Sequence, residues 1–268
     1  MNLRIAAGLG LLVTATACDD LTFGSSVGGV RESSPAVAGS VKAVGLVLQR
    51  SAPGGGHLVE AQLLLVDPGA PDRTVPVGDL KLLIGGEPLT LFAVAPNFYQ
   101  SASTPDFGNL AAGTAVSLSL VAALPSGART LSASMLLPAQ PTLRLPAVAE
   151  TPGTGRETPI ELTGAREGAL AIVSPANGWG ARVSYDLLTV AGAGTLPSER
   201  IDRWWLAASA FTGPDESLPA DAFPASGDYW VEVIALDPVA GADATDAGWA
   251  NGSWFAAGNA TGLPLEAP

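Results

Sequence analysis

The sequence predicts an all-β protein made of many short strands, arranged as two tandem β-sandwiches. Glycine and proline account for 32 and 22 of its 268 residues, and both residue types form turns and break helices. Between the turns, apolar and polar residues alternate, most regularly at 116–120 and 131–135. A period of two is typical of strands with one buried face. Hydrophobic residues make up 47% of the chain, which is enough to form cores.

The first half contains three predicted pairs of strands. Apolar runs at 41–48 and 58–66 flank Gly54-Gly55-Gly56 and predict a hairpin with a longer loop. Gly85-Gly86 separates runs at 80–84 and 88–92, and two adjacent glycines suit a tight primed turn. The alternating segments 116–120 and 131–135 follow, with a turn at Pro125-Ser126-Gly127 between them.

A break in the pattern predicts a domain boundary near residue 150. Pro138, Pro141 and Pro146 are spaced along an extended segment, and the polar, flexible sequence 151–155 follows. We therefore expect β-sandwich modules at 38–149 and 150–268. Residues 141–146 are a possible last strand of the first module.

The second half restarts the strand pattern. Residues 160–163, 183–187 and 229–235 alternate. Residues 198–211 leave two interpretations open. Ile201, Trp204, Trp205, Ala208 and Phe211 have helical spacing with Ser198 as a possible cap, and a strand through 204–206 fits equally well.

One stretch resembles a known superfold. Residues 217–223 and 226–233 resemble the later strands of fibronectin type III and immunoglobulin-like modules, in which a short strand leads through a turn into a long strand that opens near a tyrosine. The resemblance implies that the Tyr229 hydroxyl bonds back to the backbone as a corner tyrosine. The first module has the general look of the same fold.

The amino terminus has the layout of a secretory signal peptide. One positive charge at Arg4 precedes the apolar run 5–13, and small residues follow. Ala15-Thr16-Ala17-Cys18 resembles a bacterial lipobox, although that family prefers Leu where this chain has Ala15. The resemblance implies cleavage before Cys18 and attachment of lipid to its thiol. An ordinary cleaved signal peptide and an uncleaved anchor are the alternatives.

These features predict a signal peptide at 1–17 and a lipidated tether at 18–37, which is rich in glycine and serine. The protein is then exported and held at a bacterial membrane, on the periplasmic or cell-surface side. Cys18 is the only cysteine. A lone thiol in an oxidising compartment invites intermolecular disulfides, and a thioether to lipid would remove that liability.

Composition argues against several other functions. The net charge is −12 with 13 Lys and Arg residues, whereas nucleic-acid binding needs clustered basic residues. With one histidine, His57, and one cysteine, ordinary zinc and thiol chemistry are disfavoured, so no metal, cofactor or catalytic residue is predicted. Asp237, Asp243 and Asp246 are spaced unlike an EF-hand and favour a solvated acidic loop.

All six tryptophans lie in the second half. Tryptophan is a good binding anchor because it combines a large apolar area with one polar group. The candidate binding surface consists of Trp179, Trp204, Trp205, Trp249 and Trp254. The alternative for these residues is core packing, and Trp230 fits either role.

The sequence therefore predicts a lipid-anchored envelope protein with a non-catalytic binding or structural role. Its partners would be the membrane, through Cys18, and an envelope protein or glycan. One alternative is a carbohydrate-binding accessory lipoprotein that uses the carboxy-terminal tryptophans. The other is an envelope hydrolase with a carboxylate pair, for which no local motif is present.

Overall fold

The structure is a computed structural model that describes residues 41–70, 73–124, 127–149, 151, 155, 157–164, 168–178, 203–207, 216–218, 222–240, 249–250 and 253–268. The predicted signal peptide and tether, Cys18 and the predicted strand 183–187 lie outside these residues. In the described part, no helix combines the length and apolar character needed to cross a membrane.

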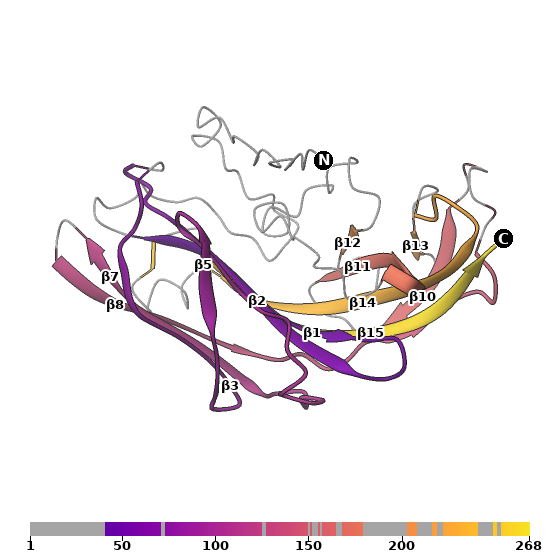
Figure 1. Cartoon of the computed structure of the whole chain (residues 1–268), viewed down its shortest axis with the longest axis horizontal. Helices are drawn as coiled ribbons and strands as arrows, with labels where there is room; N and C mark the ends of the chain where they lie inside the picture. Colours follow the sequence, from indigo (N-terminus) through magenta and orange to yellow (C-terminus); the bar gives the residue numbers. More distant parts are fainter. Residues whose placement is uncertain are drawn as a thin grey trace, which may run out of the picture.

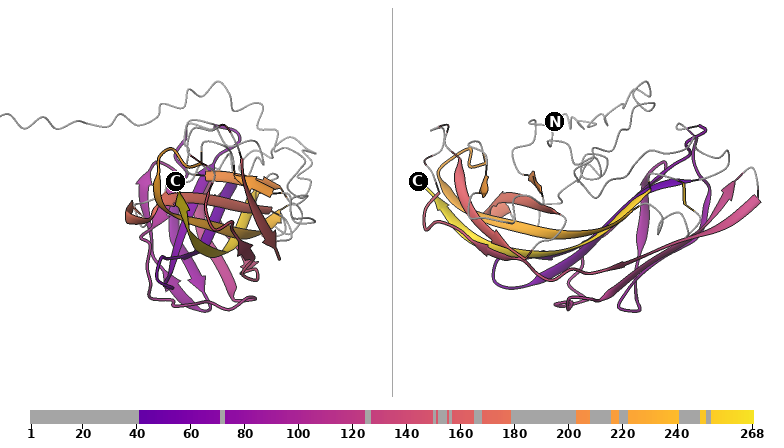
Figure 2. Two further views of the ribbon diagram at one scale, coloured as in Figure 1. Left: turned by 90° about the vertical axis from the view of Figure 1, so that its right-hand side faces the viewer. Right: turned by 180° about the vertical axis from the view of Figure 1, so that it is seen from behind.

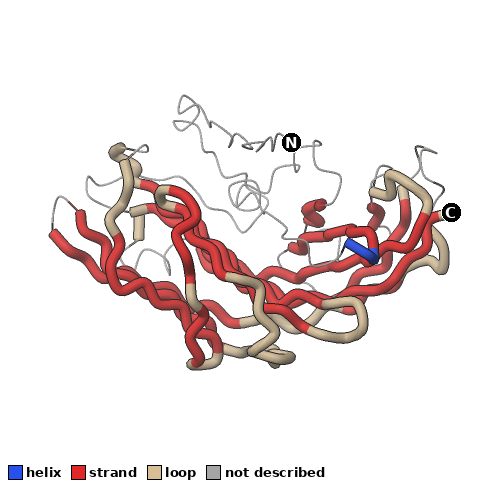
Figure 3. The backbone as a smooth tube through the Cα atoms, viewed as in Figure 1, coloured by secondary structure: helices blue, strands red, loops and turns tan. Residues whose placement is uncertain are grey.

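The protein is all-β, as predicted (Figure 3). The only helical element among the described residues is one 3-10 turn, η2 (Ala176–Gly178). The strands are β1 (Lys42–Ser51), β2 (His57–Val66), β3 (Val77–Ile84), β4 (Glu87–Leu89), β5 (Leu91–Ala95), β6 (Phe98–Ser101), β7 (Ala115–Leu124), β8 (Gly127–Leu136), β9 (Thr142–Arg144), β10 (Thr158–Thr163), β11 (Gly168–Pro175), β12 (Arg203–Ala207), β13 (Glu216–Leu218), β14 (Gly227–Ala240) and β15 (Trp254–Ala267).

One long sheet runs through the whole molecule. Within the described part of the chain it has eight strands, in the order β12-β11-β14-β15-β1-β2-β6-β5. The pair β1–β15 is parallel and the other neighbours are antiparallel. The long sheet curves along the molecule, and two smaller sheets lie towards its opposite ends (Figures 1 and 2). One smaller sheet has the order β4-β3-β7-β8 and the other β13-β10-β9.

Side-chain alternation assigns both small sheets to the same face of the long sheet. On β15, Phe255 and Ala257 belong to the core shared with β3, β7 and β8, whereas Leu265 and Ala267 belong to the core shared with β9, β10 and β13. These four positions differ by even numbers, so their side chains share a face of the strand. The neighbours Trp254 and Ala256 belong to a third buried cluster on the opposite face.

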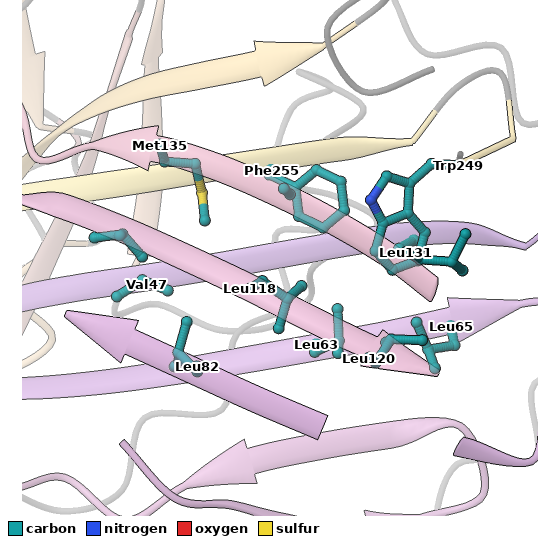
Figure 4. Packing of buried hydrophobic residues seen from close by; sticks show 14 of the residues in the cluster. Val47, Leu63, Leu65, Leu82, Leu118, Leu120, Leu131, Met135, Trp249 and Phe255 are labelled. Atoms are coloured by element: carbon teal, nitrogen blue, oxygen red, sulfur yellow. The ribbon is translucent and has the colours of Figure 1, made fainter. Parts of the chain in front are cut away.

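The first core contains side chains from the far carboxy-terminal part of the chain. Leu63, Leu118 and Leu131 pack with Phe255 and Trp249 (Figure 4). The rings of Trp249 and Phe255 are 5.2 Å apart, and the Trp249 indole donates to the Ser132 carbonyl at 2.6 Å. The first sandwich is therefore incomplete without residues 249–257.

The second core confirms the predicted corner tyrosine. Tyr229 opens the long strand β14, and its hydroxyl donates to the Ala225 carbonyl at 2.8 Å. Its ring packs edge-on against Phe223, 5.1 Å away. Leu162, Val231 and Leu218 complete the contact between the long sheet and the three-stranded sheet. This geometry matches the corner that such sandwiches use to fix the start of a strand.

The predicted boundary near residue 150 does not separate two closed sandwiches. Strand β1 of the proposed first module pairs with β15 of the second, from Val44↔Trp254 to Gln49↔Asn259. Strand β9 lies in the segment 141–146, a possible last strand of the first module, but it pairs with β10. The extended link before β9 is also tied to the long sheet, because the Gln140 side chain donates to the Ala260 carbonyl. Two sandwiches are present, but they share one sheet.

Several predicted strand pairs are confirmed, and two segments differ from the prediction. The hairpin β1–β2 and the pair β7–β8 are confirmed. So is the β3–β4 turn, where Gly85 and Gly86 have φ values of 60° and 92°. The predicted strand 88–92 is divided, because β4 belongs to the four-stranded sheet and β5 to the long sheet. Within 198–211, residues 203–207 form a strand, β12, rather than a helix.

Candidate functional site

A cleft of about 700 Å³ lies where the two layers of the first sandwich separate. Thr90 carries the chain from β4 in the four-stranded sheet to β5 in the long sheet. β5 is paired with β6 up to Leu91↔Ser101, and beyond that pair the two chain segments diverge. The lining residues are Ile84, Gly85, Glu87, Pro88, Leu89, Thr90, Phe92, Ala102, Thr104, Asp106, Phe107 and Leu110. Most of them are apolar, as is typical of ligand pockets of this size.

Hydrogen bonds to the long sheet hold the cleft wall formed by residues 102–110. Thr104 makes two backbone hydrogen bonds with Val59 of β2, at 2.8 and 3.0 Å. At the other end of the wall, the buried Gln49 side chain accepts from the Leu110 amide at 2.6 Å and donates to the Leu110 carbonyl at 3.3 Å. The wall is therefore fixed at both ends before any ligand is present.

Two carboxylates belong to the cleft. Asp106 is oriented by Thr104, whose hydroxyl donates to the Asp106 Oδ2 at 2.6 Å and accepts from the Asp106 amide at 3.2 Å. Glu87 lies on the opposite wall, at the start of β4. Both residues are exposed, and no Lys or Arg is among the lining residues. The cleft thus combines apolar walls with negative charge.

A second group of charged residues is buried in the long sheet and is not among the residues that line this cleft. Arg50 of β1 donates to Glu232 Oε2 of β14 through Nε at 3.0 Å and Nη2 at 2.6 Å. The Ser51 amide donates to Glu232 Oε1 at 2.7 Å. Glu60 lies 3.6 Å from Arg50 and accepts from the Ser103 hydroxyl at 2.9 Å. Arg50 and Glu232 expose 5% and 1% of their side chains, so water does not screen this pair.

Glycine in β15 provides the space that this arrangement needs. Glu232 is paired with Gly262 across the strands β14 and β15. A Cβ atom at Gly262 would lie 2.6 Å from the Trp230 indole, which packs over that position and donates to the Ser51 carbonyl at 2.9 Å. The missing side chain therefore leaves room for the Trp230 indole at this position, near the buried ion pair.

Burial raises the pKa of Glu232 above its ordinary value of 4.5, although the charge and hydrogen bonds of Arg50 and the Ser51 amide oppose this. Neither Glu232 nor Glu60 lines the cleft. Glu232 accepts hydrogen bonds from Arg50 and from the Ser51 amide within the sheet, and Glu60 accepts from Ser103, which follows β6 in the wall 102–110. This arrangement neutralises a buried cation and joins β1, β2 and β14.

The prediction of a tryptophan binding surface is wrong for Trp249 and Trp254. Trp249 exposes 3% and Trp254 1% of its surface, so neither offers an aromatic face to a ligand. Trp249 fills the first core, and Trp254 lies in the cluster on the opposite face of the long sheet. A chain this rich in glycine uses its few large side chains to fill space between layers. Trp230 is buried as well.

The other predicted positions are distributed as follows. Trp204 and Trp205 lie in strand β12, but the orientation of their side chains is not described, and Trp179 lies outside the described residues. His57 begins β2 and is half-buried, and its Nδ1 has no hydrogen-bond partner among the described residues. Asp237 is exposed on β14, whereas Asp243 and Asp246 are not described.

Within the described part of the chain, no three His, Cys, Asp or Glu side chains come together as a metal site. Sequence reasoning missed the cleft, because its walls come from a strand that changes sheets and from the irregular segment 102–110. The available signal was Phe92, which follows Leu91 directly and so breaks the alternation of the run 88–92.

Comparisons with known proteins add little to these observations. No protein-family profile matches the chain, and no curated protein matches it. Among solved structures, the chain is similar to one described as "Anomalous substructure of Titin-A168169". The two are 9% identical over 85% of this chain and 99% of that chain, with a TM-score of 0.19. A TM-score this low carries no argument about the fold.

Proposed function

We propose that this protein is exported and held at a bacterial membrane by lipid on Cys18, and that it has a non-catalytic binding or structural role in the envelope. The observation that carries the proposal is the order of residues 1–18: a positive charge, an apolar run, and small residues directly before a single cysteine. The lipobox resemblance of Ala15-Thr16-Ala17-Cys18 supports attachment of lipid rather than simple secretion.

Lipid attachment also suits the charge of the protein. A chain with a net charge of −12 is repelled by anionic headgroups, so electrostatic attraction does not hold it at a membrane. Each buried methylene of an acyl chain contributes about 0.8 kcal/mol, and two or more chains anchor durably. Residues 18–37 would then separate the β-sandwiches from the bilayer.

A binding role is favoured over a purely structural one by the cleft between the layers of the first sandwich. It has apolar walls, fixed hydrogen bonding along 102–110 and exposed carboxylates at Glu87 and Asp106. The partner in this proposal is another envelope component, a protein or a glycan.

The anchor is tested with Cys18→Ala in a bacterial host supplied with an alkyne-bearing fatty acid. The wild-type protein should incorporate the label and sediment with membranes, and the variant should do neither, because it lacks the acceptor thiol. Ser26→Ala, in the same tether, is the matched control and should behave as wild type. If Cys18→Ala remains labelled and still sediments with membranes, the anchor is not at this residue.

A further inference from the structure

The cleft is lined by an exposed apolar side chain, Phe92, that belongs to none of the hydrophobic cores of the described structure. Phe92 is 54% exposed, whereas Phe107 and Leu110 on the facing wall are half-buried. Phe92 lines the cleft together with these two residues. A large exposed aromatic side chain beside a preformed apolar cleft is typical of an interaction surface.

Edge strands border the same cleft. β4 ends the four-stranded sheet and β5 ends the eight-stranded sheet, so among the described strands each is paired on one side only. The free edge of β5 offers backbone amides and carbonyls to an added extended segment, whereas Pro88 in β4 has no amide to donate. The cleft therefore lies next to backbone groups that favour a polypeptide ligand over a glycan.

The charge of the cleft selects among polypeptides. Glu87 and Asp106 are exposed, lie on opposite walls, and take part in no ion pair of the described structure. The Thr104 hydroxyl fixes the Asp106 carboxylate but supplies no positive charge. Complementary charge steers partners and suppresses wrong ones, so the ligand that fits carries Lys or Arg beside its apolar residues.

We propose that the cleft binds an extended polypeptide segment in which an aromatic or aliphatic residue is adjacent to Lys or Arg. The apolar side chain enters between Phe92 and Phe107, the basic side chain reaches Asp106 or Glu87, and the backbone lies along the sheet edge. This inference rests on the binding role proposed above, but it does not depend on the lipid anchor.

The test uses the full chain purified in detergent and a bead-displayed library of random octapeptides. We expect bound peptides to be enriched in Lys or Arg next to aromatic or aliphatic residues. Phe92→Ser should weaken the binding of a selected peptide at least about tenfold, which corresponds to about 1.4 kcal/mol. Asp106→Asn should weaken it several-fold and reduce its dependence on salt.

The matched control is Leu136→Ser. Leu136 is 57% exposed on β8 and does not line the cleft, so this change removes a similar exposed apolar group elsewhere. It should leave binding unchanged. Because Phe92 and Leu136 are both exposed, neither change should disturb folding, and near-ultraviolet circular dichroism checks this.

Three results would overturn the inference. One is a library without basic–apolar enrichment. Another is equal loss of binding in Phe92→Ser and Leu136→Ser. The third is self-association of the wild-type chain that Phe92→Ser abolishes, since the occupant would then be a second copy. The peptide-binding assay in detergent tests only the cleft, and the fatty-acid labelling assay tests only Cys18. A failure of the inference can therefore be distinguished from a failure of the proposed lipid anchor.

Discussion

At the scale of single residues, the buried ion pair Arg50–Glu232 joins two strands that are far apart in the sequence. The two residues are 182 positions apart, and no local pattern in the sequence pairs them, since a charge in an alternating strand predicts an exposed face. Removing one partner of a buried pair leaves the other charge without compensation, which costs more than the pair itself contributes.

Glu232→Gln should therefore lower the free energy of unfolding by about 3 to 5 kcal/mol, measured by urea denaturation at neutral pH. Glu161→Gln is the control, because Glu161 and Arg144 are 47% and 73% exposed and an exposed pair contributes at most about 1 kcal/mol. Equal effects of the two changes would show that the buried pair is not a special determinant of stability.

At the scale of elements, β15 shows where sequence reasoning failed. The segment contains Gly258, Gly262 and Pro264, which are residue types typical of turns, and no strand is predicted for it. In the structure it is a strand from Trp254 to Ala267, paired with β14 along its whole length and with β1 from Trp254 to Asn259. Its glycines accommodate neighbouring side chains, an environment that depends on residues far away in the sequence.

Other elements were predictable because their signals are local. The hairpin of β1 and β2 and the alternation in β7 and β8 follow from spacing within a few residues. The corner tyrosine of β14 was implied by the resemblance of residues 217–223 and 226–233 to fibronectin type III and immunoglobulin-like modules. The sharing of one sheet by both sandwiches was not predictable, since it depends on the β1–β15 pairing across about 210 residues.

Gly262→Ala should destabilise the protein by roughly 1 to 3 kcal/mol through overpacking. The new methyl group would meet the Trp230 ring at 2.6 Å, and that ring is buried and hydrogen-bonded to Ser51. Gly78→Ala in β3, with no atom within 4 Å of the new Cβ, should change stability by less than about 0.5 kcal/mol. A thermal denaturation series compares them, and equal shifts would contradict this account of β15.

At the scale of the whole molecule, the shared sheet should make the two sandwiches one cooperative unit. Trp249 and Phe255 belong to the first core, and β15 continues into the second. We expect one calorimetric transition for the full chain. With a protease site inserted between Gly153 and Thr154, the cleaved pieces should co-elute until denaturant is added. Separation of the pieces under native conditions would show that the sandwiches are independent.

The central claim for the whole molecule is that it is displayed at a membrane from Cys18. This claim rests on the sequence alone, because the described structure begins at residue 41, after the predicted tether. No Lys or Arg lies between Cys18 and Arg31, so trypsin releases residues 18–31 as one peptide from the processed protein.

Mass spectrometry of that peptide, from protein isolated from its native membranes, is the most direct test. The account predicts a peptide that begins at Cys18 and carries the mass of a diacylglycerol thioether, with or without a further acyl group on the amino terminus. An unmodified Cys18, or a mature chain that begins at another residue, would contradict it.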